Sequence, residues 1–238
     1  MNAASKTNKQ GTQTPANAAR GKAPSACKRC GICCSKGGPS FHKADKALIE
    51  TGVIPSKCLY TIRKGEMAYD NVRGCLQPAD SDIIKIKGQG NSWTCLFFDD
   101  ARAACTIYED RPLECRALKC WDTAELEALY ARKRLQRSDL LAGIEGLWDL
   151  IKDHQERCNY ETIFTLVNAI KSKKAGNARG KLAELIQYDT EIRKLVVSQG
   201  GLDADMLDFL FGRPLSQTLR HFGLTAVQKR DKIVVEQR

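Results

Sequence analysis

Four cysteines within eight residues, in the run CKRCGICC at residues 27–34, constrain this chain more than any other feature. A cysteine that only fills a core needs no companions at fixed spacing. A metal ion does, because several thiolates must converge on one point. Two-residue spacers let a tight turn direct successive thiolates to the same ion, and Gly31 supplies the backbone freedom that such a turn often needs. The run therefore predicts binding of a metal or a metal cluster.

The cysteine count favours ligation over disulfide bonds. The chain has 11 cysteines in 238 residues, an odd number, and residues 1–25 lack the apolar segment of a secretory signal. The sequence contains no run of 18 apolar residues, which is about the length needed to span a bilayer. A protein in a reducing compartment keeps its thiols free. We therefore expect a cytoplasmic protein with no membrane contact.

Composition divides the chain into three regions. Residues 1–25 are polar and carry four cations (Lys6, Lys9, Arg20, Lys22) with no acidic residue, so a disordered basic tail is expected. Residues 26–122 hold ten of the eleven cysteines, and residues 123–238 are charged, amphipathic and helical. The formal net charge of +10 includes that tail, and elsewhere acidic and basic residues alternate. A nucleic-acid partner is therefore not indicated, and an unknown protein partner stays open.

The predicted fold class is α+β. In the cysteine-rich domain we expect a short helix over residues 43–51 and an antiparallel β-meander of strands 82–87, 93–98 and 103–108. The second hairpin of this meander would set Cys95 and Cys105 opposite each other, with Cβ atoms about 5 Å apart, so that both could share one metal.

The segment 109–116 predicts a loop that enters a helix. Asp110 is the expected N-cap and Pro112 suits the first turn. Cys115 would then lie in the first turn, where the helix dipole lowers a thiol pKa, and Cys120 near the helix end.

The C-terminal region predicts an all-α domain that ends in a short hairpin. Apolar periodicity and capping signals indicate helices over residues 123–134, 144–157, 160–171, 181–197, 204–211 and 215–222, and a hairpin within 224–235.

Three strings resemble one known family. They are Cys27-x2-Cys30-Gly31-x-Cys33-Cys34, then Cys95-Leu-Phe-Phe, then Cys105-Thr-Ile-Tyr-Glu-Asp-Arg-Pro-Leu-Glu-Cys115-Arg116. This pattern, over residues 26–122, closely resembles the YkgJ-type cysteine-cluster proteins, also described as the CxxCxxCC zinc- or iron-chelating domain. The resemblance implies a metal or iron–sulfur site at Cys27, Cys30, Cys33, Cys34, Cys95, Cys105 and Cys115, with Cys120 less firmly shared.

The identity of the metal stays open at this stage. The upstream run resembles the first three ligands of a bacterial ferredoxin, which favours a [4Fe–4S] cluster. A Cys95/Cys105 pair on a hairpin is equally typical of a zinc ribbon. Because neighbouring side chains diverge, we expect Cys33 and Cys34 to serve two centres, or one of them to be spare. Arg111 and Arg116 are candidates to neutralise a thiolate cofactor.

The remaining cysteines and histidines are expected to be structural. Cys58, Cys75 and Cys158 stand alone, and only His42 lies near the run. The predicted function is therefore a metal-binding protein that acts as an electron-transfer, regulatory or accessory module. The alternative is a cluster-dependent protein-modifying enzyme, since the family also resembles the cysteine-rich part of flagellin lysine N-methylases. The C-terminal half carries no motif that matches them.

Overall fold

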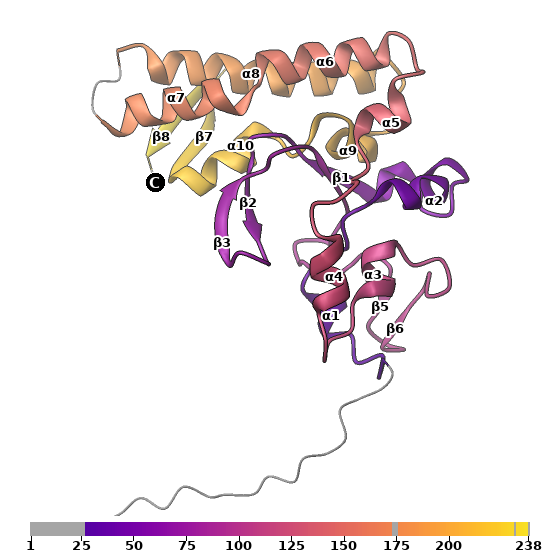
Figure 1. Cartoon of the computed structure of the whole chain (residues 1–238). Coiled ribbons are helices and arrows are strands. Elements are labelled where there is room, and N and C mark those ends of the chain that lie inside the picture. The colour runs from indigo at the N-terminus through magenta and orange to yellow at the C-terminus, as the bar shows by residue number, and fades with distance from the viewer. Residues whose placement is uncertain (1–26, 173–175, 231, 238) are drawn as a thin grey trace, which may run out of the picture.

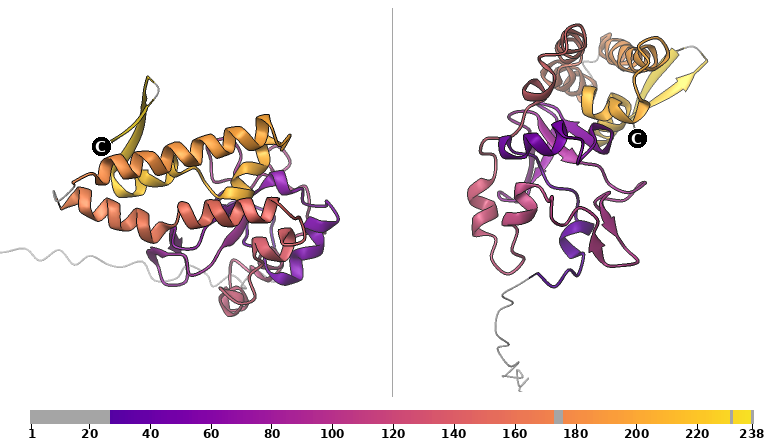
Figure 2. Two further views of the ribbon diagram at one scale, coloured as in Figure 1. Left: turned by 90° about the horizontal axis from the view of Figure 1, so that it is seen from above. Right: turned by 90° about the vertical axis from the view of Figure 1, so that its right-hand side faces the viewer.

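The computed structural model describes residues 27–172, 176–230 and 232–237, so the predicted tail at residues 1–25 lies outside the described residues. Three long helices form a layer at one end of the molecule: α6 (Leu147–Arg157), α7 (Tyr160–Lys171) and α8 (Ala178–Ser198). The short elements that carry the cysteine motif gather at the opposite end (Figures 1 and 2). Strand pairs and short helices lie between them. Within the described residues, no helix combines the length and apolarity needed to cross a bilayer.

The cysteine-rich region is built from short helices and strand pairs. Its helical pieces are α1 (Ile32–Ser35), the 3-10 turn η1 (Lys43–Asp45), α2 (Lys46–Glu50), the 3-10 turn η2 (Ser56–Cys58) and α3 (Leu113–Ala117). Its strands are β1 (Leu59–Ile62), β2 (Met67–Asp70), β3 (Cys75–Pro78), β4 (Ile83–Ile86), β5 (Phe98–Asp99) and β6 (Ala104–Cys105). The helix expected over residues 43–51 is confirmed as η1 and α2.

The prediction of a three-stranded meander is wrong, because its strands do not pair with one another as expected. The strand expected at 82–87 exists as β4, but it pairs antiparallel with β1, and β2 pairs with β3. The other two predicted strands shrink to the two-residue pair β5–β6. Residues 88–97 are instead taken up by tight turns, because a Gly-Gln-Gly-Asn segment favours turns over continued pairing. Strands β1–β3 were not predicted.

The C-terminal region follows its predicted pattern closely. Besides α6–α8 it contains α4 (Ala124–Leu129), α5 (Arg137–Leu141), η3 (Ala204–Met206), α9 (Leu207–Phe211), α10 (Leu215–Thr218) and η4 (Leu219–Phe222). The hairpin β7 (Leu224–Lys229) with β8 (Lys232–Gln237) is also present. Helix α7 has the predicted bounds, because the Asn159 side chain accepts a hydrogen bond from the Thr162 N–H and caps it. Helix α5 was missed.

Two apolar cores stabilise the chain. One packs β1, β4 and the start of the cysteine region against α6 and α9, with members such as Phe41, Ile84, Leu135, Ile151 and Phe209. The other is formed within residues 158–235 by α7, α8, α10 and the last hairpin. The first core thus contains residues from both sides of residue 122, and the predicted domain boundary there stays a prediction.

A buried polar clamp joins the same two sides. Arg137 Nε donates to Asp82 Oδ2 at 2.6 Å, and its other nitrogens donate to Gln155 Oε1 at 2.9 Å and to the Leu210 carbonyl at 2.5 Å. The guanidinium therefore donates hydrogen bonds to acceptors from α6, from α9 and from the residue just before β4. These bonds offset the free-energy cost of burying its charge.

Candidate metal centre

The CKRCGICC run forms a tight loop that enters the one-turn helix α1. Gly31 is the N-cap of α1 with φ +74°, a left-handed conformation that favours glycine. The loop also passes directly over an aromatic ring, since an ideal Cβ on Gly31 would lie 2.2 Å from Cζ of Phe98. Gly31 is thus required both by its backbone angle and by this approach, and it holds Cys33 and Cys34 against the second cysteine segment.

Cys95 lies in a turn that docks on α1. Its backbone N–H donates to the Cys34 carbonyl at 2.8 Å, and its own carbonyl accepts from the Phe98 N–H at 2.9 Å. The Gln89 side chain donates to the Cys95 carbonyl at 3.2 Å and to the Phe98 carbonyl, which braces this turn from the 88–92 loop. Cys95 is buried, with 8% of its surface exposed.

Cys105 reaches the same region from β6. Its register partner is Phe98 rather than Cys95, so the prediction that Cys95 and Cys105 face each other across a hairpin is wrong. The hairpin is shorter than expected, and Cys95 precedes it by three residues. Cys95 still lies within range of the Cys105 charge, since burial first and then the Cys105 charge raise the pKa of Cys95.

Helix α3 presents Cys115, and its entry is capped from far along the chain. Pro112, not Asp110, is the N-cap residue, and the Leu113 N–H donates to Oδ1 of the buried Asp45 at 2.8 Å. The expectation for Asp110 failed because Pro112 ends the loop two residues later than expected. Asp45 also accepts from the His42 N–H at 2.9 Å.

Glu114 anchors the same helix to the polypeptide before η1. Its carboxylate accepts from the Ser40 N–H at 2.7 Å and lies 3.2 Å from His42 Nε2. The other ring nitrogen of His42 lies 2.7 Å from the Arg132 carbonyl. Both nitrogens of His42 are therefore engaged in positioning α3 rather than directed at a metal.

The thiols of five cysteines from four segments influence one another. A hydrogen bond from Cys34 outweighs burial and lowers the pKa of Cys33 to about 6. The same bond, burial, and then the charges of Cys33, Cys95 and Cys115 raise the pKa of Cys34. Burial, followed by the charges of Cys95, Cys105 and other neighbours, raises the pKa of Cys115 to about 12. We call Cys33, Cys34, Cys95, Cys105 and Cys115 the inner thiols.

The electrostatics of the inner thiols correct one expectation and test the fit of a metal. The pKa of Cys115 is raised, not lowered, because burial and neighbouring thiolates outweigh the dipole of a five-residue helix. Several thiolates that disfavour one another's charge are stabilised by a cation placed among them. The donor set is soft sulfur, which zinc and iron both accept. The chemistry of the residues therefore fits a zinc or iron centre.

The spacing of Cys33 and Cys34 overturns the expectation that these neighbours diverge. Their Sγ atoms lie 4.0 Å apart. A tetrahedral site with Zn–S bonds of about 2.3 Å needs an S···S separation of about 3.8 Å. Across the described residues, however, no three cysteine, histidine or acidic side chains are spaced to hold an ion without movement. A metal would have to draw the inner thiols together.

Cations near the thiols come from expected and unexpected positions. Arg111 stacks on the Tyr108 ring at 3.6 Å, and its charge lowers the pKa of Cys33. Arg116 instead donates to the Arg111 carbonyl at 2.7 Å and lies 3.8 Å from Asp45. Lys85 was missed. Burial lowers its pKa, while charges that include those of Glu114, Cys115 and Cys95 oppose that shift. Its signal in the sequence was a lone cation inside the apolar strand Ile-Ile-Lys-Ile.

The other cysteines lie apart from the inner thiols or on the surface. Cys27, Cys30 and Cys120 are exposed, and Cys120 follows the end of α3 in a turn closed by the Lys119–Asp122 bridge. Cys58 ends η2, Cys75 begins the exposed strand β3, and Cys158 is buried in the second core.

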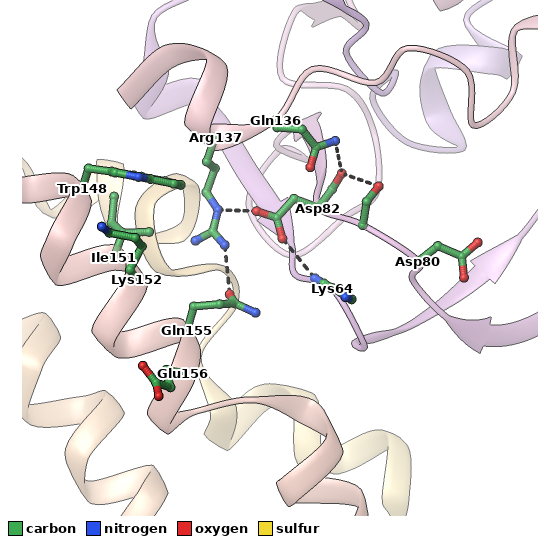
Figure 3. A pocket seen from close by; sticks show the side chains of 11 residues that line it. Lys64, Asp80, Asp82, Gln136, Arg137, Trp148, Ile151, Lys152, Gln155 and Glu156 are labelled. Carbon is green, nitrogen blue, oxygen red and sulfur yellow. Dashed lines mark hydrogen bonds and ion pairs between the residues drawn. The ribbon is translucent and has the colours of Figure 1, made fainter. Parts of the chain in front are cut away.

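Two surface concavities, of about 510 and 550 Å³, lie elsewhere on the molecule. The first is lined by Trp148 and the Arg137 clamp (Figure 3), and the second by residues of α8 and the segment after it. Neither lining includes a cysteine.

Comparison with known proteins agrees with the resemblance seen in the sequence. Residues 26–136 match the family CxxCxxCC, whose description is "Putative zinc- or iron-chelating domain". The chain is also 32% identical over 98 residues to a 5-dehydro-2-deoxygluconokinase of Lacticaseibacillus casei, a match that covers 38% of this chain and 30% of that protein. No solved structure matches the chain. The family match covers 111 of the 238 residues and includes all five inner thiols.

Proposed function

We propose that this chain is a metal-binding protein whose centre is drawn from the eight motif cysteines, with the inner thiols at its heart. One observation carries the proposal: within the region that matches a zinc- or iron-chelating family, the Cys33 and Cys34 Sγ atoms lie 4.0 Å apart and the Cys95 N–H, from a distant segment of the chain, donates to the Cys34 carbonyl at 2.8 Å. Cys27, Cys30 and Cys120 are exposed beside or beyond them and complete the candidate set.

The free energy of metal binding can offset the chain entropy lost when cysteines far apart in the sequence are brought together. Sixty residues lie between Cys34 and Cys95, and closing such a loop costs about 4 kcal/mol of chain entropy. In this fold, β1–β4 pairing and the first core already bring the two segments together, so part of that cost is met without metal. A structural zinc contributes about 10–16 kcal/mol, which exceeds the remainder.

Two identities for the metal have separate support. The 4.0 Å Cys33–Cys34 separation favours a mononuclear thiolate ion such as zinc, because both sulfurs can then bind the same ion. The Cys27, Cys30, Cys33 spacing favours a [4Fe–4S] cluster, in which successive thiolates bind different irons. We place zinc first on the geometry and the iron–sulfur cluster second on the sequence.

Arg111 and Lys85, from two different segments, would offset the negative charge of a thiolate centre. Arg111 extends from the loop before α3, and Lys85 extends from β4 toward Ser40 Oγ at 3.4 Å. A zinc centre would suit a regulatory or accessory role, because Zn²⁺ has no redox chemistry, whereas an electron-transfer role requires the iron–sulfur cluster. The enzymatic alternative has weaker support, because neither concavity described above adjoins a cysteine.

Metal and sulfide analysis of protein purified without oxygen tests the proposal. Zinc in colourless protein supports the first identity, whereas iron with acid-labile sulfide and a broad visible absorbance supports the second. Cys95→Ser, which changes a buried thiol, should abolish or strongly reduce metal content. The matched control Cys58→Ser changes a partly buried thiol of the same region and should retain the metal. Equal metal loss in both variants, or metal-free wild-type protein, would contradict the proposal.

A further inference from the structure

A patch of exposed apolar and basic side chains lies beside the inner thiols. Trp93 is 65% exposed, Ile32 is 62% exposed and Leu96 is 39% exposed. Lys28, Arg29 and Lys36 are exposed on the same two segments, residues 27–37 and 86–98. We call these six residues the Trp93 face.

Backbone contacts hold the two segments of the Trp93 face together. The Gly31 backbone lies against the Phe98 ring, and the Cys34 carbonyl accepts from the Cys95 N–H. An ideal Cβ on Gly37 would lie 3.9 Å from the Trp93 carbonyl. Each apolar member of the face lies within three residues of one of these contacts, so the two segments that carry the face lie side by side.

The loop that displays Trp93 is firmly hydrogen-bonded. The Gln89 N–H donates to the Thr94 carbonyl at 2.8 Å, and the Ser92 N–H donates to the Gln89 carbonyl at 2.9 Å. Gly88 admits no side chain, because an ideal Cβ there would lie 2.1 Å from the Ser92 carbonyl oxygen. A large aromatic ring held out to solvent on such a loop points to a ligand rather than to packing.

The charge of the face is of one sign. Segments 27–37 and 86–98 contain four cations (Lys28, Arg29, Lys36 and Lys87) and no acidic residue. The Lys87 ammonium donates to the Asp205 carbonyl and the Arg29 guanidinium lies over the Tyr108 ring, so Lys28 and Lys36 are the cations of the face without such a contact among the residues that the structure describes. The next acidic residue, Asp99, already lies 3.5 Å from Arg102. The 26 residues that lead into Cys27 add four more cations, again with no acidic residue. The charge of these segments favours an anionic ligand.

We propose that the Trp93 face binds single-stranded nucleic acid, with a base stacked on Trp93 and phosphates bound by Lys28, Arg29 and Lys36. One exposed planar ring among cations is the pattern of sequence-tolerant single-strand binding. An acidic protein would need a larger apolar centre than these three side chains offer. The helices alone gave no indication of nucleic acid, because their charges are mixed. The inference depends on this face and not on which metal is bound.

The test measures fluorescence anisotropy of labelled 15-mer oligo-dT with the full-length protein as purified with its metal. Three phosphate contacts predict a slope of about −2 in log affinity against log salt, or about 20-fold weaker binding at 200 mM than at 50 mM salt. Trp93→Ala should weaken binding about 5- to 150-fold, and Trp93→Phe should largely preserve it. Leu195→Ala removes a 45% exposed apolar side chain from α8 and should change nothing.

Charge variants and a competitor complete the design. Lys36→Ser should reduce the salt slope by about 0.7, whereas Lys194→Ser, on α8, should leave it unchanged. Oligo-dT should quench tryptophan fluorescence in the wild type and quench it less in Trp93→Phe. Equal affinity of Trp93→Ala and wild type, equal effects of the two lysine variants, or displacement by poly-glutamate as effective as by unlabelled oligo-dT would overturn the proposal. Metal content is measured on each sample, so failure of metal binding is seen separately.

Discussion

Replacing Gly31 by alanine tests whether the CKRCGICC loop is held by close approach to Phe98. The left-handed φ of +74° costs an alanine about 1–2 kcal/mol. The new Cβ would lie 2.2 Å from the Phe98 ring, and such overpacking adds about 1–3 kcal/mol. Gly52 has a similar φ of +77° with nothing within 4 Å, so Gly52→Ala should show the backbone cost alone.

The two variants separate the backbone term from the contact. If the loop must move to admit the Cβ, Gly31→Ala should weaken metal affinity about 5- to 150-fold more than Gly52→Ala, since about 1.4 kcal/mol corresponds to a factor of ten. Competition against a chromophoric chelator measures this ratio, with thermal unfolding as a second measurement. Phe98→Leu in the Gly31→Ala background should restore most of the loss.

Two results would refute this reasoning. Equal metal affinities for Gly31→Ala and Gly52→Ala would show that the Phe98 contact does not position the thiols. A Phe98→Leu substitution that leaves the Gly31→Ala defect unchanged would show that the defect comes from the backbone angle alone.

Three further predictions concern the surrounding structure. Asp45→Ala should lower the free energy of unfolding by about 2–5 kcal/mol in urea titrations, because the backbone N–H groups of Leu113 and His42 lose their acceptor. The control Glu50→Ala, at an exposed position, should change the free energy of unfolding by less than about 0.5 kcal/mol. Burial lowers the pKa of His154 below 6.5, so the folded state resists protonation of this side chain. The free energy of unfolding should therefore fall as the pH drops below about 6.5, and it should fall less steeply in His154→Gln. Chelation should make residues 88–105 protease-sensitive while α7 and α8, which have their own core, keep their circular dichroism signal; loss of both together would reject a boundary near residue 122.

Features encoded within a few neighbouring residues were predictable from the sequence. Helix α7 begins where Asn159 caps it and follows an unbroken apolar stripe, so its bounds needed no tertiary information. The CKRCGICC run likewise pointed to the family that residues 26–136 match, because thiolate spacing is a local property. Gly31 was expected to permit a tight turn, and its left-handed φ agrees.

Only the tertiary structure decided which distant groups meet. Strand β4 pairs with β1 rather than with its neighbour in the chain, Asp45 caps α3 from 68 residues away, and Lys85 lies near Cys95 and Cys115. Cys105 lies on a strand as predicted, but Cys95 lies in a turn before the hairpin and Phe98 takes its place opposite Cys105. Periodicity and capping reflect interactions over about one helical turn, whereas strand partners, burial and thiol pKa values depend on segments that the sequence pattern leaves unspecified.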